Sequence, residues 1–195
     1  MLKKIVALCL IATSFQHVSA VENAHLSGRA GYQFLTDDTL AKIYKNGGPQ
    51  LAVAYSYKTG KNLSLSANAG FFEATGKSIG LNEKTKLSKS FLDLGVIWHA
   101  AQYKKLSLDL TVGPRISIVS QRNETPIIAP LINAQGLGAF GNVHAYAAYK
   151  DIYVGVFAEF SYEPIRHNKI LSDGYTPPTC SVGGIALGLS LMSTF

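Results

Sequence analysis

Apolar and polar residues alternate along most of the chain with a period of two, which is typical of β-strands. The C-terminal end is the clearest instance, because its leucines share one phase and small or polar residues fill the other. The same alternation predicts eight strands, at about 24–34, 50–57, 63–72, 91–100, 106–118, 136–149, 152–162 and 182–195. The chain is therefore predicted to be all-β.

The connections between these strands alternate in length. Three are short, at 58–62, 101–105 and 150–151, and four are long, at 35–49, 73–90, 119–135 and 163–181. Short turns on one side and long loops on the other are typical of bacterial outer-membrane barrels. The short side is predicted to be periplasmic, with both termini, and the long loops to face outward. The two-residue turn Lys150-Asp151 predicts that Tyr149 pairs with Ile152, which puts His144, Asn142 and Phe140 inside.

The first twenty residues have the three-part pattern of a secretory signal peptide. Lys3 and Lys4 precede an apolar run, residues 5–15, and the small residues Ser19 and Ala20 mark a cleavage site. The apolar run is too short to span a bilayer as a helix. We expect residues 1–20 to be removed and residues 21–195 to form one exported barrel domain.

Composition supports a membrane protein without an apolar helix. Charged residues make up 15% of the chain, against about 25% in soluble domains, and no apolar run approaches about 20 residues. The net charge is +6, from 18 Lys+Arg and 12 Asp+Glu, and loss of Lys3 and Lys4 leaves 16 − 12 = +4. Removal of Cys9 leaves Cys180 as the single cysteine, so no internal disulfide is expected.

The residue types on the two faces decide which face points outward. A secreted lipocalin-like barrel would bury the apolar phase, but the polar phase here is small, as in Ser64, Ser66 and Gly95, and suits a narrow lumen better than a solvated surface. The apolar phase also carries aromatic residues in two groups, as expected for girdles at two membrane interfaces. The short-turn group is Tyr57, Trp98, Tyr149 and Phe195, and the long-loop group is Tyr32, Phe34, Phe71, Phe160 and Tyr162.

The last strand carries a family resemblance. Leu189, Leu191 and the terminal Phe195 resemble the assembly signal of bacterial outer-membrane barrels, and the pattern of the mature chain resembles the OmpX, OmpA transmembrane-domain and opacity-protein type. This resemblance implies an eight-stranded antiparallel up-and-down transmembrane β-barrel in the bacterial outer membrane. It also implies recognition of the last strand by the barrel-assembly machinery, and a role in adhesion, host interaction or envelope integrity.

Charged residues in the inward phase predict a polar network inside the barrel, because buried charges must be paired. Its predicted members are Arg29, Asp93, Asp109, Arg115, Asn142 and Glu159. The short turns place Asp93 opposite or diagonal to Arg115 and Glu159 across from Asn142. A salt-bridged plug is the favoured interpretation, and a narrow gated pore is the alternative. Pro114 points outward in the fifth strand, where a local bulge would accommodate it.

No catalytic, cofactor or metal site is predicted. His25, His99 and His144 lie toward the short-turn side, whereas lipid A-modifying barrels resembling this one use His–Ser groups at the outer rim. His167 lies in the last long loop with Ser172 and Asp173, without a compact His-x-Ser pattern. The scattered histidines and Cys180 lack metal-ligand spacing.

The favoured function is a non-enzymatic surface barrel. Its four long loops would contact a host surface ligand or lipopolysaccharide, and its wall would contact outer-membrane lipid. Lysines in the second long loop (Lys77, Lys84, Lys86 and Lys89) suit anionic lipopolysaccharide headgroups better than nucleic acid. A narrow channel for small or apolar solutes and a lipid A-modifying enzyme are the alternatives.

Overall fold

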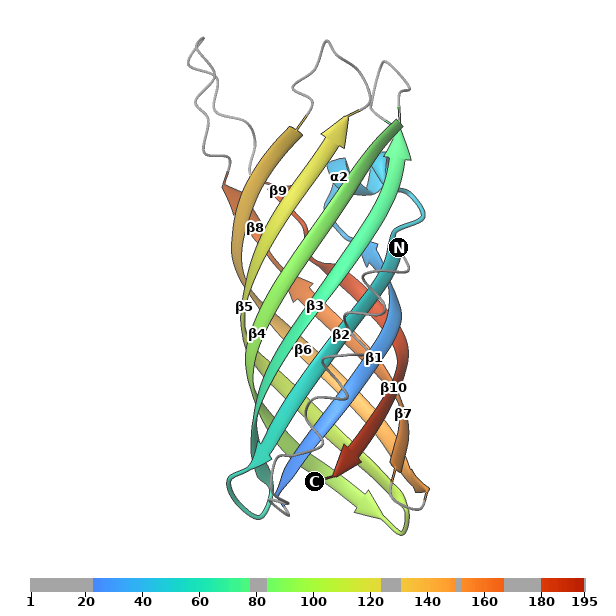
Figure 1. Cartoon of the computed structure of the whole chain (residues 1–195), viewed down its shortest axis with the longest axis vertical. Helices are drawn as coiled ribbons and strands as arrows, with labels where there is room; N and C mark the ends of the chain where they lie inside the picture. The colour runs from blue at the N-terminus through green and yellow to red at the C-terminus, as the bar shows by residue number, and fades with distance from the viewer. Residues whose placement is uncertain (1–22, 78–83, 124–130, 150–151, 167–179, 195) are drawn as a thin grey trace.

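The computed structural model describes residues 23–77, 84–123, 131–149, 152–166 and 180–194. These residues form long strands and one short helix (Figure 1). In chain order the elements are β1 (Ala24–Leu35), α2 (Asp38–Ile43), β2 (Gly48–Lys58), β3 (Leu63–Lys77), β4 (Lys84–Tyr103), β5 (Leu106–Asn123), β6 (Leu131–Tyr149), β7 (Ile152–Tyr162), β8 (Pro164–Arg166), β9 (Cys180–Ser181) and β10 (Gly184–Thr194).

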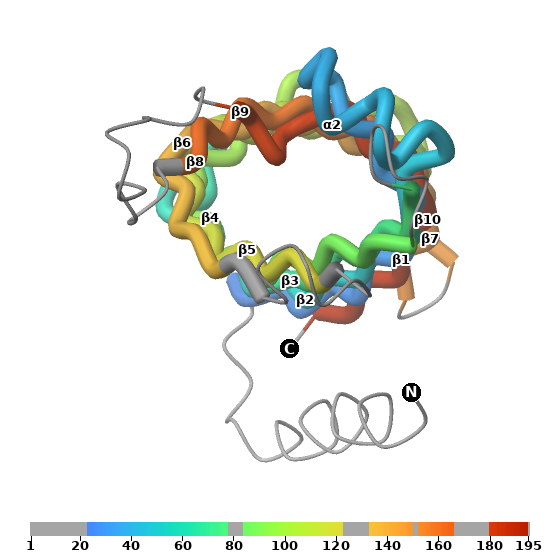
Figure 2. The backbone as a smooth tube through the Cα atoms, turned by 90° about the horizontal axis from the view of Figure 1, so that it is seen from above, coloured from blue at the N-terminus to red at the C-terminus, as the bar shows by residue number. Residues whose placement is uncertain are grey.

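The strands close into one antiparallel barrel. Each strand from β1 to β7 pairs with the next, and β10 pairs with both β7 and β1. The short β8 continues the wall after β7, and β9 precedes β10, so the ten segments make eight crossings. Figure 2 shows the ring viewed along the barrel. The prediction of an eight-stranded up-and-down barrel is confirmed.

The two ends of the barrel differ. The short-turn end, at the bottom of Figure 1, contains the β2–β3 and β4–β5 turns, the start of β1 and the end of β10. The long-loop end contains α2 and the outer ends of β3 to β6. Tyr149 pairs with Ile152 as predicted, and His144 and Phe140 are buried inside the barrel. The predicted signal peptide, Phe195 and the Lys150-Asp151 turn lie outside the described residues.

Two of the predicted long loops are largely strand. Pairing continues from Phe71 opposite Ser90 to Lys77 opposite Lys84, and β5 extends to Asn123. The inward phase stays buried in these extensions and includes the apolar Ala74, Leu87 and Val119. Their outward phase becomes polar, so the contrast that reveals a membrane strand is lost there. The predicted boundaries at 73–90 and 119–135 are therefore wrong.

The apolar phase faces outward along the wall. Leu94, Val112 and Leu189 are 59%, 63% and 64% exposed. A belt of large exposed apolar side chains around a closed barrel is expected where lipid replaces water. The described aromatics of the short-turn group lie at that end of this belt, and those of the long-loop group lie at the other.

Among the described residues, no helix is both long enough and apolar enough to cross a membrane.

Pro114 causes no register shift. The pairs Asp93–Arg115 and Val96–Val112 keep one register on either side of it, and Pro114 itself pairs with Ala139 of β6. The described β4–β5 ladder shifts register between His99 and Ala101 instead, so the local bulge considered at Pro114 is not observed. At Gly113, next to Pro114, an added Cβ would lie 1.9 Å from the Leu94 carbonyl oxygen. Glycine thus allows a close strand approach beside the proline.

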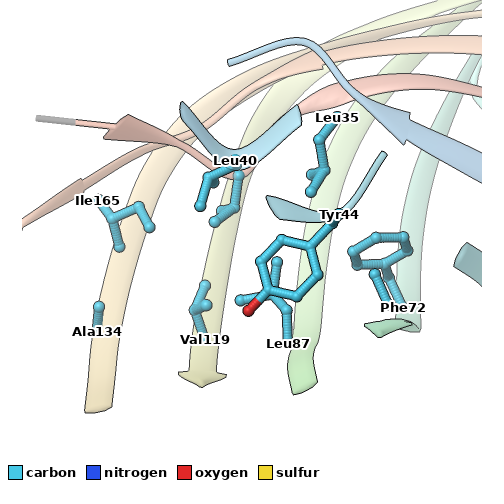
Figure 3. Packing of buried hydrophobic residues seen from close by; sticks show 10 residues of the cluster. Leu35, Leu40, Tyr44, Phe72, Leu87, Val119, Ala134 and Ile165 are labelled. Atoms are coloured by element: carbon cyan, nitrogen blue, oxygen red, sulfur yellow. The ribbon is translucent and has the colours of Figure 1, made fainter. Parts of the chain in front are cut away.

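A hydrophobic core fills the lumen at the long-loop end. Helix α2 belongs to the first predicted long loop, and Figure 3 shows its Leu40 and the adjoining Tyr44 turned toward Val119 and Leu87. The strands contribute inward-facing apolar residues from around the ring. The buried members are Leu35, Leu40, Tyr44, Phe72, Ala74, Leu87, Val119, Ala134, Ile165 and Val182. We call this set the outer apolar core.

Candidate functional site

Arg115 is the centre of an ion cluster below the outer apolar core. Its Nε and Nη2 atoms donate to the two carboxylate oxygens of Asp93 at 2.6 and 2.7 Å. Its Nη2 also donates to Glu159 at 2.8 Å, and its side chain is completely buried. The two-pronged contact with Asp93 is the strong geometry of an arginine–carboxylate pair. The register expected for Asp93 and Arg115 is observed.

A second cation, Lys89, extends the cluster toward the long-loop end. Its Nζ donates to Glu163 Oε1 at 2.9 Å and to the Val182 carbonyl at 3.2 Å. Both charged side chains are 0% exposed, and Arg115 Nη1 lies 3.4 Å from the same Glu163 oxygen. Lys89 and Glu163 were predicted to lie in loops. Their phase could have revealed them, because Lys89 shares the inward phase of Asp93 and Glu163 shares that of Glu159.

Neutral side chains complete the cluster. Asn68 Nδ2 donates to Asp93 at 2.7 Å, and Gln50 Nε2 lies 3.4 Å from Glu159. The Arg115 guanidinium carbon lies 4.1 Å from the centre of the Phe91 ring. The cluster joins residues of β2, β3, β4, β5 and β7, so it crosses the lumen rather than lining one wall. We call Lys89, Asp93, Arg115, Glu159 and Glu163 the central ion cluster.

Three residues predicted for this network lie outside its direct contacts. Asn142 is opposite Glu159 in register, as predicted, but its buried amide nitrogen and oxygen have no hydrogen-bond partner among the described residues. Asp109 accepts from His99 instead. Arg29 lies over the Phe157 ring at 5.8 Å, and its Nε has no hydrogen-bond partner within the described part of the chain.

Ser64, His99 and Asp109 form a hydrogen-bonded trio near the short-turn end. His99 Nε2 lies 2.8 Å from Ser64 Oγ, and His99 Nδ1 lies 2.8 Å from Asp109 Oδ1. This is the order of groups in a serine-hydrolase triad. A nucleophile must meet its substrate, however, and Ser64 is 1% exposed. The trio therefore suits a structural role. Sequence reasoning missed it because its members come from three strands.

The described residues contain no group of three or more His, Cys, Asp and Glu side chains placed to hold a metal ion. Cys180 is a half-buried free thiol. His167, Ser172 and Asp173 lie outside the described residues.

Asp37 fastens α2 over the barrel mouth. Its Oδ1 accepts from the backbone N–H groups of Thr39 and Leu40 at 3.0 and 3.1 Å, which caps the helix. Its Oδ2 accepts from the N–H of Ser181 in β9 at 3.0 Å. Tyr44 follows the helix, and its hydroxyl lies 3.0 Å from Thr85 Oγ1. Burial raises the pKa of Tyr44, so this phenol stays neutral in the outer apolar core.

Four exposed cations lie on the outward face of the β3–β5 extensions. Lys77 pairs directly with Lys84, and Lys86 with Arg122. Like charges in directly opposed positions repel one another. Glu73 offsets part of this charge through a 2.8 Å contact with Lys86. We call Lys77, Lys84, Lys86 and Arg122 the outer basic quartet. It lies beyond the aromatic Phe71 on the same face of the wall.

Solved structures with the same architecture are small outer-membrane barrels. Neisserial surface protein A matches with a TM-score of 0.60 and 10% identity over 88% of this chain and 97% of that one. OprG from Pseudomonas aeruginosa matches with a TM-score of 0.58 and 10% identity over 91% of this chain and 100% of that one. A third match is Ail, the attachment invasion locus protein of Yersinia pestis, in complex with the heparin analogue sucrose octasulfate. Its TM-score is 0.54, with 10% identity over 88% of this chain and 99% of that one.

No protein-family model and no curated relative matches the chain. At these identities the structural similarity shows the fold alone. By fold, the chain is a small eight-stranded antiparallel β-barrel of the kind found in outer-membrane proteins.

Proposed function

We propose that this protein is a non-enzymatic surface barrel whose outer end binds the phosphorylated headgroups of lipopolysaccharide. The observation that carries this proposal is the outer basic quartet. Phe71 marks the edge of the apolar belt, and outward positions 73, 75 and 77 follow it along β3. This position supports a location just beyond the hydrocarbon region, where phosphorylated headgroups of the outer leaflet would lie.

The charge arrangement supports an anionic partner. Two directly opposed cation pairs are unfavourable alone, and phosphate groups between them would turn repulsion into attraction. Each cation near a charged membrane surface contributes about 1 kcal/mol of attraction. Lys42 and Lys45, exposed beside α2, add positive charge at the same end. Recognition of the last strand by the assembly machinery, export after cleavage at Ala20 and a host surface ligand remain part of this proposal.

The closed outer end of the lumen favours this role over a channel. The central ion cluster and the outer apolar core lie in series along the described lumen, and both are fully buried. A solute would have to displace both. An enzymatic role has less support, because the Ser64 hydroxyl is closed off from substrate.

The test is lipopolysaccharide-dependent stability of the refolded barrel. We would measure the thermal midpoint, as the heat-dependent gel shift, in vesicles with and without lipopolysaccharide. The substitutions Lys77→Gln, Lys84→Gln, Lys86→Gln and Arg122→Gln are combined in one variant. The matched control combines Lys58→Gln, Lys61→Gln, Lys104→Gln and Lys105→Gln, which remove four exposed cations from the short-turn end.

We expect lipopolysaccharide to raise the midpoint of the wild type and the control but not of the quartet variant. Dephosphorylated lipopolysaccharide should have a much smaller effect on all three proteins. Equal stabilisation of the quartet variant and the control would contradict the proposal. Binding of a sulfated glycan without any response to lipopolysaccharide would favour the host-ligand alternative instead.

A further inference from the structure

The lumen on the short-turn side of the central ion cluster contains a cavity of about 40 Å³. A single water needs roughly 10–15 Å³ by this measure, so the space holds only a few atoms. Most of its lining residues are polar, and they come from strands around the ring. Its polar lining residues are His25, Ser27, Arg29, Ser56, Ser66, Asn68, His99, Asp109, Thr111, His144 and Tyr146.

Arg29 is the unpaired charge of this cavity. One face of its guanidinium lies over Phe157, and its Nε is shielded from solvent without a hydrogen-bond partner in the described structure. Within the described residues, no carboxylate oxygen lies within ion-pair distance of Arg29, although Asp93 and Glu159 of the ion cluster attract it from farther away. A buried cation without a direct partner is costly.

The rest of the wall is rich in hydrogen-bond donors. Arginine can only donate, and the one carboxylate in the wall, Asp109, is already engaged by His99 at 2.8 Å. His144 Nε2 is engaged by Ser190 at 2.6 Å. Ser27, Ser66 and Thr111 also line the cavity, and their hydroxyl groups can donate hydrogen bonds. Besides Asp109, the wall contains the neutral Asn68 carbonyl oxygen, which has no partner among the described residues, so Arg29 has no anionic partner of its own.

We propose that this cavity binds a small monovalent anion of halide size, held by the Arg29 guanidinium and neighbouring hydroxyls. Size and charge select this class of ligand. Arg29 has no direct anionic partner, and the small volume favours a monatomic anion over a phosphate or a larger carboxylate. Asp93, Asp109 and Glu159 repel every anion, and they repel a multivalent anion more strongly than a monovalent one. A halide resembles water in size and gains the charge-assisted hydrogen bonds that water cannot match. This site is separate from the outer basic quartet and does not depend on the lipopolysaccharide proposal.

Crystals of the refolded mature barrel grown or soaked in sodium bromide test the site directly. We expect an anomalous bromide peak within hydrogen-bond distance of the Arg29 guanidinium. A cavity that contains only water at high bromide concentration would overturn the proposal. This measurement needs no variant, so it stands even where a substitution prevents folding.

Solution stability gives a second test. The thermal midpoint is compared in chloride and in gluconate, which is too large for the cavity, at equal ionic strength. Chloride at ten times its dissociation constant should raise the midpoint by about 3–6 °C. The shift should disappear in Arg29→Gln and remain in Arg122→Gln, which removes an exposed arginine outside the lumen. Equal shifts in both variants, or no shift in the wild type, would refute anion binding at Arg29.

Discussion

Within one continuous barrel wall, the lumen at the long-loop end is packed with apolar side chains, whereas the lumen at the short-turn end is polar and encloses a cavity. The outward surface is apolar beside the short-turn half, whereas beside the outer apolar core it passes from the apolar belt to the polar β3–β6 extensions. The outer half resembles the interior of a soluble protein, with a helix packed onto it. The polar half resembles a small vestibule. The central ion cluster separates the two.

This contrast shows that the inside of a narrow barrel can be closed at one end without being filled throughout. Sealing by apolar packing needs close contact on all sides, and α2 provides the side that strands alone leave open. The polar half tolerates empty or hydrated space, because its side chains can hydrogen-bond to water or to an ion. Substitutions in the two halves should therefore differ in cost.

The largest effect is expected at the boundary between the halves. Arg115→Ala would leave Asp93 and Glu159 buried without their main cation, which costs about 3–5 kcal/mol for a broken buried pair. Urea unfolding of the refolded barrel in vesicles, followed by the gel shift, measures this loss. Arg122→Ala, at an exposed position, serves as the control with little change. An unchanged unfolding midpoint for Arg115→Ala would show that the ion cluster does not hold the lumen together.

A matched pair of truncations compares the halves directly. Leu87→Ala empties part of the outer apolar core and should reduce the free energy of unfolding by about 2–5 kcal/mol. Met192→Ala enlarges a cavity that already exists and should cost about 1 kcal/mol. The same urea titration measures both. Equal losses would mean that the two halves are packed to the same degree, against the contrast described above.

Loss of the helix cap should act on the outer half alone. Asp37→Ala removes acceptors for Thr39, Leu40 and Ser181, with an expected cost of about 1–2 kcal/mol. Asp38→Ala, at an exposed position in the first turn, should change stability by only a few tenths of that amount. Hydrogen exchange of the α2 amides measures the local effect. Faster exchange throughout the short-turn half would contradict an effect limited to the outer end.

The smallest effect is expected in the polar half. Ser64→Ala removes the 2.8 Å hydrogen bond to His99 and should cost about 0.5–1.5 kcal/mol. Ser66→Ala, at the next inward position, should stay within about 0.5 kcal/mol. Lipid A mass spectra should be identical for both variants and the wild type. A change in lipid A that requires Ser64 would revive the enzyme alternative.

Much of the barrel could be predicted because lipid imposes a simple rule on each strand. Apolar residues must alternate outward wherever the wall meets hydrocarbon, so seven of the strand starts or ends near short turns were well placed, including Leu63, Leu106 and Ile152. This outward alternation of apolar residues is required only where the wall meets hydrocarbon. The outer parts of β3 to β6 alternate in burial but not in hydrophobicity, so they lack the outward apolar residues by which a membrane strand is predicted.

The lumen was predicted only where pairing register determines it. Asp93 and Arg115 meet because two strands joined by a short turn fix their positions. Lys89 and Glu163 meet across the barrel, and Arg29 faces a cavity rather than a partner. Those contacts depend on how the sheet closes and on rotamers inside it, which a one-dimensional pattern does not contain. The inward fold of α2 likewise depends on the shape of the mouth that it covers.

The bond from Asp37 to Ser181 has a consequence for the order of barrel assembly. It joins the first outer connection to the segment that precedes the last strand, and Lys89 and Gln33 both donate to the neighbouring Val182 carbonyl. These contacts can form only once the segment before β10 is in place. The hold of the first outer connection on the barrel is therefore completed late in assembly, by residues that enter just before the last strand.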